Sequence, residues 1–167
     1  MKKYIMLIGL PASGKSTYLK ELLIQYPEAV VISRDHFVEE KARELGSTYD
    51  QVFKEYSKEV DENFKNYVQH IRESLPDVVI NDKTNLTNNN RDKEVQHFKD
   101  SGYELTYIFF EKPKRDVDHY VWKQRLGSRK GKFIPDSVVE DMLKRYEDNV
   151  NGRIAPDYMF RIKSWGK

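Results

Sequence analysis

The stretch YIMLIGLPASGKST, residues 4–17, decides the fold of this 167-residue chain. Residues 4–8 are apolar and rich in β-favouring side chains, which predicts a short buried strand. Residues 9–16, GLPASGKS, match the spacing Gly-x-x-x-x-Gly-Lys-Ser/Thr, and residues 15–26 carry apolar side chains at helical spacing. A glycine-rich loop between a strand and a helix is the context in which this pattern, the Walker A motif, binds phosphate.

The loop contains the residue types that a phosphate site needs. Gly9 and Gly14 permit backbone dihedrals closed to other residues, so successive N–H groups can turn inward and form an anion site at a helix N-terminus. Lys15 is expected to meet the outer phosphates, and Ser16 to offer its hydroxyl to Mg²⁺. The alternative is an ordinary turn of small residues. We predict that the loop binds ATP through Gly9, Pro11, Ala12, Ser13, Gly14, Lys15, Ser16 and Thr17.

Length and composition favour one domain over residues 1–167, because 38% hydrophobic residues can build a single core and no linker is apparent. Cysteine is absent, which excludes a disulfide framework and thiolate metal sites and agrees with a cytoplasmic location. The start of the chain imitates a signal peptide, but Gly9 and Pro11 interrupt its apolar run. No stretch is long enough to span a bilayer, so no membrane partner is expected.

Strands and helices are expected to alternate after the first helix. Strands are predicted at residues 28–33, 77–81, within 101–111 after a turn, and at 157–162, and helices at about 36–45, 49–75, 115–126 and 135–148. Within residues 84–98, Thr87 or a neighbouring asparagine could cap a short helix that buries Val95 and Phe98. This alternation predicts an α/β fold, a parallel sheet covered by helices on both faces. Such sheets bind ligands at the carboxyl ends of their strands, where SRD (33–35) and NDKTN (81–85) join the phosphate loop. In the long helix, the stripe of Phe53, Tyr56, Val60, Phe64, Tyr67, Ile71 and Leu75 is interpreted as core packing.

Asp35 is the best companion of the phosphate loop. It follows a buried strand on the expected ligand edge, where its carboxylate could accept the proton of a hydroxyl that attacks the γ-phosphate. The structural alternative is that Asp35 caps the next helix. Arg34 is either a substrate contact or a surface charge. Asp82, at the tip of the third strand, could hold a magnesium-bound water or pair with an arginine, or form a surface ion pair with Lys83.

Positive charge is concentrated in KQRLGSRKGK, residues 123–132, although the net charge is only +2. Cationic side chains over a migrating phosphoryl group stabilise its transition state, and Arg125 and Arg129 would share one face of a helix. Gly127 and Gly131 would let residues 123–134 hinge as a basic lid. The alternative is a solvated charge run. The net charge permits an anionic partner without requiring one.

The motifs GLPASGKST, VISRDHF, VVINDKTNLTNNNR and RLGSRKGKFIP resemble, in the same order, those of the kinase domain of phage and animal polynucleotide 5′-kinases. The resemblance covers nearly the whole chain. It implies a P-loop kinase fold like that of adenylate kinase, with a parallel sheet of order 2-3-1-4-5, and a requirement for ATP and Mg²⁺. It also implies that Asp35 is the general base, that Lys15 and Ser16 serve the phosphates and magnesium, and that Arg125 and Arg129 are lid arginines, Arg129 touching the ATP phosphates.

Two positions depart from the phage pattern. Val38 stands where an arginine grips the phosphate of the acceptor, and Lys83 stands where the pattern has aspartate. Asp82 fits the animal version, DxTN, which implies Asp82 with Ser16 at the metal and Asn85 with Arg34 and Asp35 at the acceptor. The resemblance is to the kinase domain alone and does not extend to the phosphatase domain that often accompanies it.

Three functions remain open. The first is a kinase of 5′-hydroxyl ends of DNA or RNA, with nucleic acid as its partner. The second is a kinase of the same fold that acts on a nucleoside, another small hydroxyl compound, or hydroxymethylated bases in DNA. The third is a nucleotide-binding module without transfer activity. Asp35 and the two arginines argue against the third, whereas Val38 keeps the second open.

Overall fold

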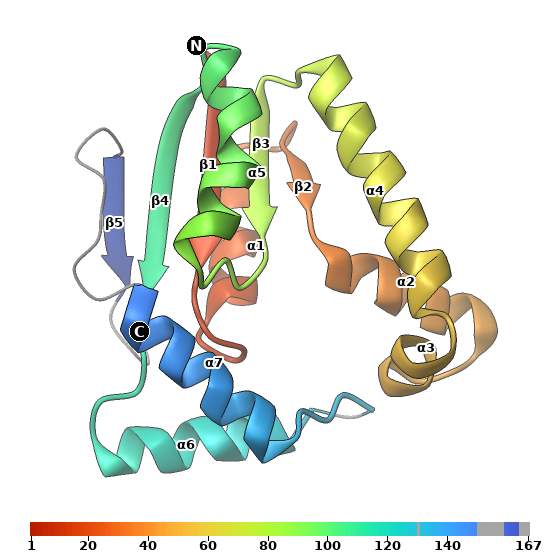
Figure 1. The fold of residues 1–167 in the computed structure, drawn as a ribbon, viewed down its shortest axis with the longest axis vertical. Helices are drawn as coiled ribbons and strands as arrows, with labels where there is room; N and C mark the ends of the chain where they lie inside the picture. The colour runs from red at the N-terminus through yellow and green to blue at the C-terminus, as the bar shows by residue number, and fades with distance from the viewer. Residues whose placement is uncertain (130, 150–158, 164–167) are drawn as a thin grey trace.

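A computed structural model describes residues 1–129, 131–149 and 159–163 of the protein. Within them lies a five-stranded parallel sheet of order β2-β3-β1-β4-β5, so the predicted α/β class and strand order 2-3-1-4-5 are confirmed (Figure 1). The strands are β1 (Lys3–Ile8), β2 (Val30–Ile32), β3 (Val78–Asp82), β4 (Glu104–Phe110) and β5 (Met159–Lys163). The helices are α1 (Lys15–Gln25), α2 (Arg34–Leu45), α3 (Tyr49–Glu55), α4 (Ser57–Ser74), α5 (Asn88–Asp100), α6 (Asp116–Gly127) and α7 (Asp136–Asn149).

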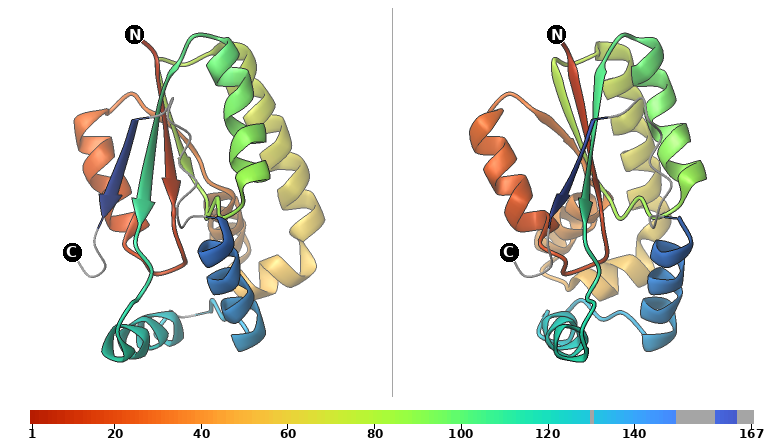
Figure 2. Two further views of the ribbon diagram at one scale, coloured as in Figure 1. Left: turned by 60° about the vertical axis from the view of Figure 1, so that its left-hand side comes forward. Right: turned by 90° about the vertical axis from the view of Figure 1, so that its left-hand side faces the viewer.

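The two faces of the sheet carry different helices, as the rotated views in Figure 2 show. Successive residues of β1 point to opposite faces because a strand has a side-chain period of two. On one face Ile5 and Leu7 pack against Leu19 and Leu22 of α1. The other face carries the larger core, to which β1, α4, α5, α6 and α7 contribute Tyr4, Met6, Ile8, Ile71, Phe98, Trp122 and Leu143.

The prediction of one helix over residues 49–75 is wrong, because the chain bends at Tyr56 (φ −120°, ψ 14°) between α3 and α4. In a straight helix Val52 and Val60 would lie about 12 Å apart along the axis. The bend lets both side chains pack with Val38 and Ala42 of α2 in a small separate core. This core fixes α3 beside α2, so residues of both helices can face one site.

Most other predicted elements agree with the structure. Thr87 caps α5 by accepting a hydrogen bond from Asn90 N (3.3 Å), and α5 buries Val95 and Phe98 as expected. Lys130 of the basic segment and residues 157–158 of the predicted last strand lie outside the described residues. In the part of the chain that the structure describes, no helix combines the length and apolarity needed to cross a membrane.

Candidate active site

The phosphate loop lies between β1 and α1, at the carboxyl edge of the sheet. Gly14, the residue before α1, is left-handed (φ 101°), a conformation that glycine adopts without strain. At Gly9, a Cβ would lie 2.9 Å from both Phe110 Cβ and Ser13 Oγ, so the backbone passes too close for a side chain. The glycine spacing of the motif is therefore required by backbone conformation and by close packing.

The Lys15 side chain reaches back to the start of the phosphate loop. Its Nζ donates a hydrogen bond to Gly9 O at 2.9 Å. Burial lowers the pKa of Lys15 to about 8, and the negative charges of Asp82 and Asp35 only partly oppose that shift. An ammonium group that is short of solvent and has no direct ion pair among the described residues is suited to an anionic ligand.

Two buried polar atoms near the loop also lack a partner within the described residues. They are Ser13 Oγ and Arg129 Nη1, neither of which makes a hydrogen bond there. Buried donors without acceptors are costly, and bound phosphate oxygens would satisfy them. The loop and its surroundings therefore fit a polyphosphate.

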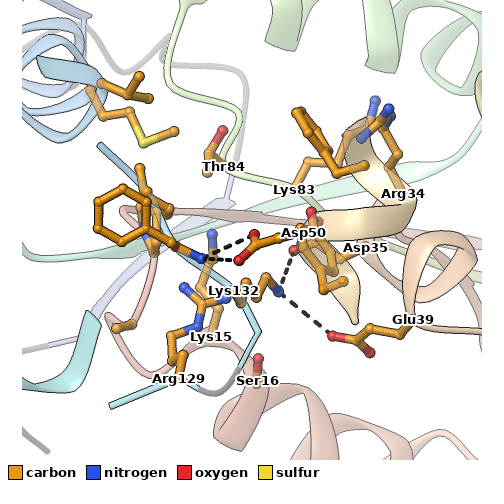
Figure 3. Close-up of a pocket in the computed structure, with 18 of the residues that line it drawn as sticks. Lys15, Ser16, Arg34, Asp35, Glu39, Asp50, Lys83, Thr84, Arg129 and Lys132 are labelled. Atoms are coloured by element: carbon orange, nitrogen blue, oxygen red, sulfur yellow. Dashed lines mark hydrogen bonds and ion pairs between the residues drawn. The ribbon is translucent and has the colours of Figure 1, made fainter. Parts of the chain in front are cut away.

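A cavity of about 510 Å³ opens next to the loop, and residues from distant parts of the chain line it (Figure 3). Eight of the predicted site residues line this cavity: Pro11, Ala12, Lys15, Ser16, Arg34, Asp35, Asp82 and Arg129. The rule that ligands bind at the carboxyl ends of parallel strands therefore locates the cavity correctly.

Asp35 is the second residue of α2, and its carboxylate points into the cavity (Figure 3). The residue preceding α2 is Ser33, so the alternative that Asp35 is the helix cap is wrong. Asp35 Oδ1 accepts a hydrogen bond from the Tyr49 hydroxyl at 2.7 Å, and Oδ2 accepts one from Lys132 Nζ at 3.3 Å. Burial alone would raise the pKa of Asp35, but Lys132 and Tyr49 outweigh it and lower the pKa.

In the sequence, Lys132 is one of several cations in the basic segment. In the structure, it pairs with two carboxylates at the cavity. Its side chain is 16% exposed, and Nζ lies 3.3 Å from Asp35 Oδ2 and 3.6 Å from Glu39 Oε1. The ammonium also lies 4.4 Å from the centre of the Tyr49 ring. No local pattern could single out Lys132 or Tyr49, because their partner Asp35 is distant in sequence.

Asp82 ends β3 and lines the same cavity as Ser16. Lys83 pairs with Glu94 at 2.7 Å, so the predicted surface pair between Asp82 and Lys83 is wrong. Burial raises the pKa of the Asp82 carboxyl. The positive charge of Lys15 partly opposes this rise, and the negative charge of Asp35 adds to it. The described residues hold no cluster of three or more acidic or histidine ligands. Mg²⁺ is usually bound through one or two carboxylates plus phosphates and water, so Asp82 and Ser16 fit it.

Arg34 and Asn85 are the two further residues predicted to contact the acceptor. Arg34 lines the cavity, but its guanidinium donates to Asp61 Oδ1 (2.7 Å) and Ser57 Oγ (3.0 Å). Asn85 is 5% exposed, and its amide nitrogen donates to Leu7 O at 2.9 Å, which ties the loop after β3 to β1. The structure does not bring Asn85 to the cavity, because its side chain is used inside the protein.

The expectation that Arg125 and Arg129 share one helix face is wrong, because α6 ends at Gly127 and only Arg125 lies on it. Arg129 lines the main cavity, whereas Arg125 lines a separate depression together with Gly14 and Thr17 of the phosphate loop. The two depressions share Ala12, Lys15 and Ser16, so both arginines line spaces that adjoin the phosphate loop.

The loop that follows Arg129 is docked on α3. Asp50 N donates to Gly131 O at 2.8 Å, and Phe133 N donates to the Asp50 carboxylate at 3.0 Å (Figure 3). We call residues 131–135 the docked loop. Its contacts carry Lys132 to Asp35 and Phe133 to the rim of the cavity.

Aromatic side chains form the outer wall of the cavity. Phe53 and Phe133 are 50% and 75% exposed, and Tyr49 is stacked on Phe53 with ring centres 6.1 Å apart. The prediction that Phe53 is core is therefore wrong, although Val60 and Ile71 of the same stripe are buried. Trp122, which the sequence patterns did not single out, donates from Nε1 to Pro11 O at 2.7 Å and fixes the phosphate loop to α6.

Several solved structures share this fold at low sequence identity. A chain of the Pnkp1/Rnl/Hen1 RNA repair complex is 18% identical with a TM-score of 0.64, and the match covers 92% of this chain and 46% of that one. Kti12 from Chaetomium thermophilum in complex with ADP-AlF3 is 18% identical (TM-score 0.61, 98% and 89% covered). A sugar kinase from Janibacter is 16% identical (TM-score 0.57, 98% and 86% covered).

The present chain spans about half the length of the RNA repair protein that it matches. No curated protein matches the sequence significantly. The profile of one family, AAA_33, described as an AAA domain, matches residues 5–148, which include the phosphate loop, Asp35, Asp82 and Arg129. The chain belongs to this AAA domain family and has a kinase-like P-loop fold.

Proposed function

We propose that this protein is an ATP-dependent kinase that transfers the γ-phosphoryl group to a hydroxyl of a nucleic acid, in the first place the 5′-hydroxyl end of DNA or RNA. One observation carries the proposal. An ionised carboxylate, Asp35, lines the same cavity as the phosphate-loop ammonium of Lys15 and the guanidinium of Arg129. A nucleotide-binding module needs the loop but has no use for a poised carboxylate.

The loop backbone, Lys15 and Arg129 would bind the phosphates, and Asp82 with the Ser16 hydroxyl would hold Mg²⁺. Mg²⁺ held there would neutralise charge that develops on the phosphoryl oxygens. Two cations at fixed positions add to this stabilisation, because the cavity is partly shielded from water. The orphaned Nη1 of Arg129 supports this role, since a phosphate oxygen would satisfy it.

Asp35 would accept the proton of the attacking hydroxyl. A carboxylate has about four acceptor positions, and Tyr49 and Lys132 use one on each oxygen. The Asp35 side chain is 54% exposed, so an acceptor hydroxyl can reach it. In the transfer, the hydroxyl oxygen forms a bond to the γ-phosphorus, the bond to the ADP oxygen breaks, and the proton passes to Asp35.

The aromatic wall supports an acceptor that contains a ring. Phe133 is 75% exposed at the rim of the cavity, and a nucleobase can stack on such a ring with about 1–3 kcal/mol per base. The same wall would also accept a nucleoside. That second candidate is favoured by Val38, which is fully buried in the core of α2 and cannot contact a phosphate.

The test is a transfer screen with γ-labelled ATP. The acceptors are 5′-hydroxyl DNA and RNA oligonucleotides, duplexes with hydroxymethylated bases, and free nucleosides. We expect label on the 5′ ends of oligonucleotides. Label on nucleosides alone would replace the first candidate with the second, and no transfer to any acceptor, with ATP binding intact, would contradict a kinase of these substrates.

A further inference from the structure

Another cavity, of about 600 Å³, lies beside the active site between α4 and the middle of α5. Both helices cover the same face of the sheet (Figures 1 and 2). One face of α4 lines it with Asp61, Phe64, Lys65, Val68, Gln69 and Arg72, which recur at three, four and seven residues. We call this space the α4 groove.

The α4 groove borders the active-site cavity directly. Arg34 and Lys83 line both spaces, and Figure 3 shows them at the same end of the active-site cavity. The two spaces are therefore neighbours that share Arg34 and Lys83 in their lining. From Asp61 to Arg72 the groove follows three turns of α4, a rise of about 16.5 Å.

Positive charge exceeds negative charge along this groove. Arg34 and Lys83 are held by Asp61 and Glu94, each at 2.7 Å. That leaves Lys65 and Arg72, for which the described residues provide no ion pair. Arg72 Nε is buried and has no hydrogen-bond acceptor in the described part of the chain. A buried guanidinium N–H without an acceptor is costly and points to an anion that is bound there in the complete complex.

We propose that the α4 groove binds the phosphodiester backbone of the acceptor strand, on the 3′ side of the nucleotide whose 5′-hydroxyl lies at Asp35. This inference rests on the proposed function. Arginine matches a phosphate through two parallel N–H donors, and lysine adds a point charge at the exposed edge of the groove. A nucleoside or a sugar cannot reach Arg72 from Asp35, so the groove selects a strand over a small acceptor.

The test compares two groove variants with a matched control. Lys65→Glu inverts an exposed charge, and Arg72→Gln removes the guanidinium while keeping a polar side chain. The control is Lys20→Glu, an exposed residue of α1 on the opposite face of the sheet. The probe is a fluorescent single-stranded octanucleotide with a free 5′-hydroxyl, and its anisotropy is measured at several salt concentrations, alongside transfer kinetics.

We expect each groove variant to weaken octanucleotide binding about 10-fold and to reduce the salt slope by about 0.7 for each phosphate that the variant no longer neutralises. KM for the octanucleotide should rise while kcat and ATP affinity stay unchanged, and the control should behave as wild type. Lys65→Glu keeps the test valid if Arg72→Gln is less stable, because Lys65 is exposed.

The failures are distinguishable. If wild type and both groove variants bind and phosphorylate the octanucleotide equally well, the assignment of the α4 groove as a backbone-binding site is overturned. The proposed function then stands. If wild type neither binds nor phosphorylates it, the proposed function fails and the groove assignment falls with it. If the variants and the control lose binding equally, the effect is general charge and the specific groove is contradicted.

Discussion

Asp35 and Lys132 form the contact on which the protonation state of the cavity depends. The ammonium of Lys132 is largely enclosed and the carboxylate of Asp35 is half exposed. Together with the Tyr49 hydroxyl, Lys132 keeps the pKa of Asp35 below its usual value despite burial. A general base with a lowered pKa is ionised over a wide pH range, although it is also a weaker proton acceptor.

The first prediction concerns Lys132→Met. Removing the ammonium raises the pKa of Asp35, so the acidic limb of the pH profile of kcat/KM should move to higher pH. The profile is measured by steady-state transfer between pH 4 and 8, with Lys54→Met, an exposed lysine of α3, as the control. An acidic limb that stays in place would show that Lys132 does not set the ionisation of the base.

The second prediction concerns Lys15, whose pKa burial lowers to about 8. Above this pH the free protein carries a partly deprotonated Lys15, whereas bound phosphates favour the ammonium form. ATP binding at about pH 8.5 should therefore take up a proton. Titration calorimetry in buffers of different ionisation enthalpy measures that uptake, which should vanish in Lys15→Met. Equal uptake in wild type and variant would assign the proton to another group.

At the scale of elements, Asp50 of α3 holds the docked loop. Asp50 uses both its backbone N–H and its carboxylate to hold Gly131 and Phe133. Gly131 is left-handed (φ 66°), and a Cβ there would lie 2.9 Å from Thr48 Cβ. The fit is therefore specific to glycine, and it brings Lys132 to Asp35.

The third prediction is that Asp50→Ala loosens the docked loop. Without the carboxylate, Phe133 N has no acceptor, and trypsin should cleave after Lys132 about 10-fold faster than in wild type with ATP bound. Mass spectrometry identifies the cleavage site. Glu55→Ala, an exposed change on the same helix, is the control. If Asp50→Ala is cleaved no faster than Glu55→Ala, Asp50 does not hold the loop.

The elements also show how far local pattern predicts structure. The run from β1 through the phosphate loop to α1 could be predicted because its glycine spacing and helical periodicity are local properties. The bend at Tyr56 could not, because it follows from the packing of Val52 and Val60 on α2. The end of α6 before Arg129 likewise separates two arginines that spacing alone places together.

At the scale of the whole molecule, three chain segments meet at one edge of the sheet. Lys15 and Asp35 follow β1 and β2, and Asp82 ends β3; these strands are neighbours in the order β2-β3-β1. Their convergence could be predicted, since parallel strands present their carboxyl ends together. The partners Tyr49 and Lys132 could not be predicted, because they reach Asp35 through a helix bend and a loop that no sequence period encodes.

The central claim is that Asp35 makes this cavity a site of phosphoryl transfer rather than of nucleotide binding alone. The measurement is single-turnover transfer by Asp35→Asn with a confirmed acceptor, together with ATP binding and melting temperature, and with Glu40→Gln on the exposed side of α2 as the control. The account predicts that ATP binding and stability survive while transfer falls by about 10² to 10⁴. Transfer within a few-fold of wild type, with ATP binding intact, would contradict it.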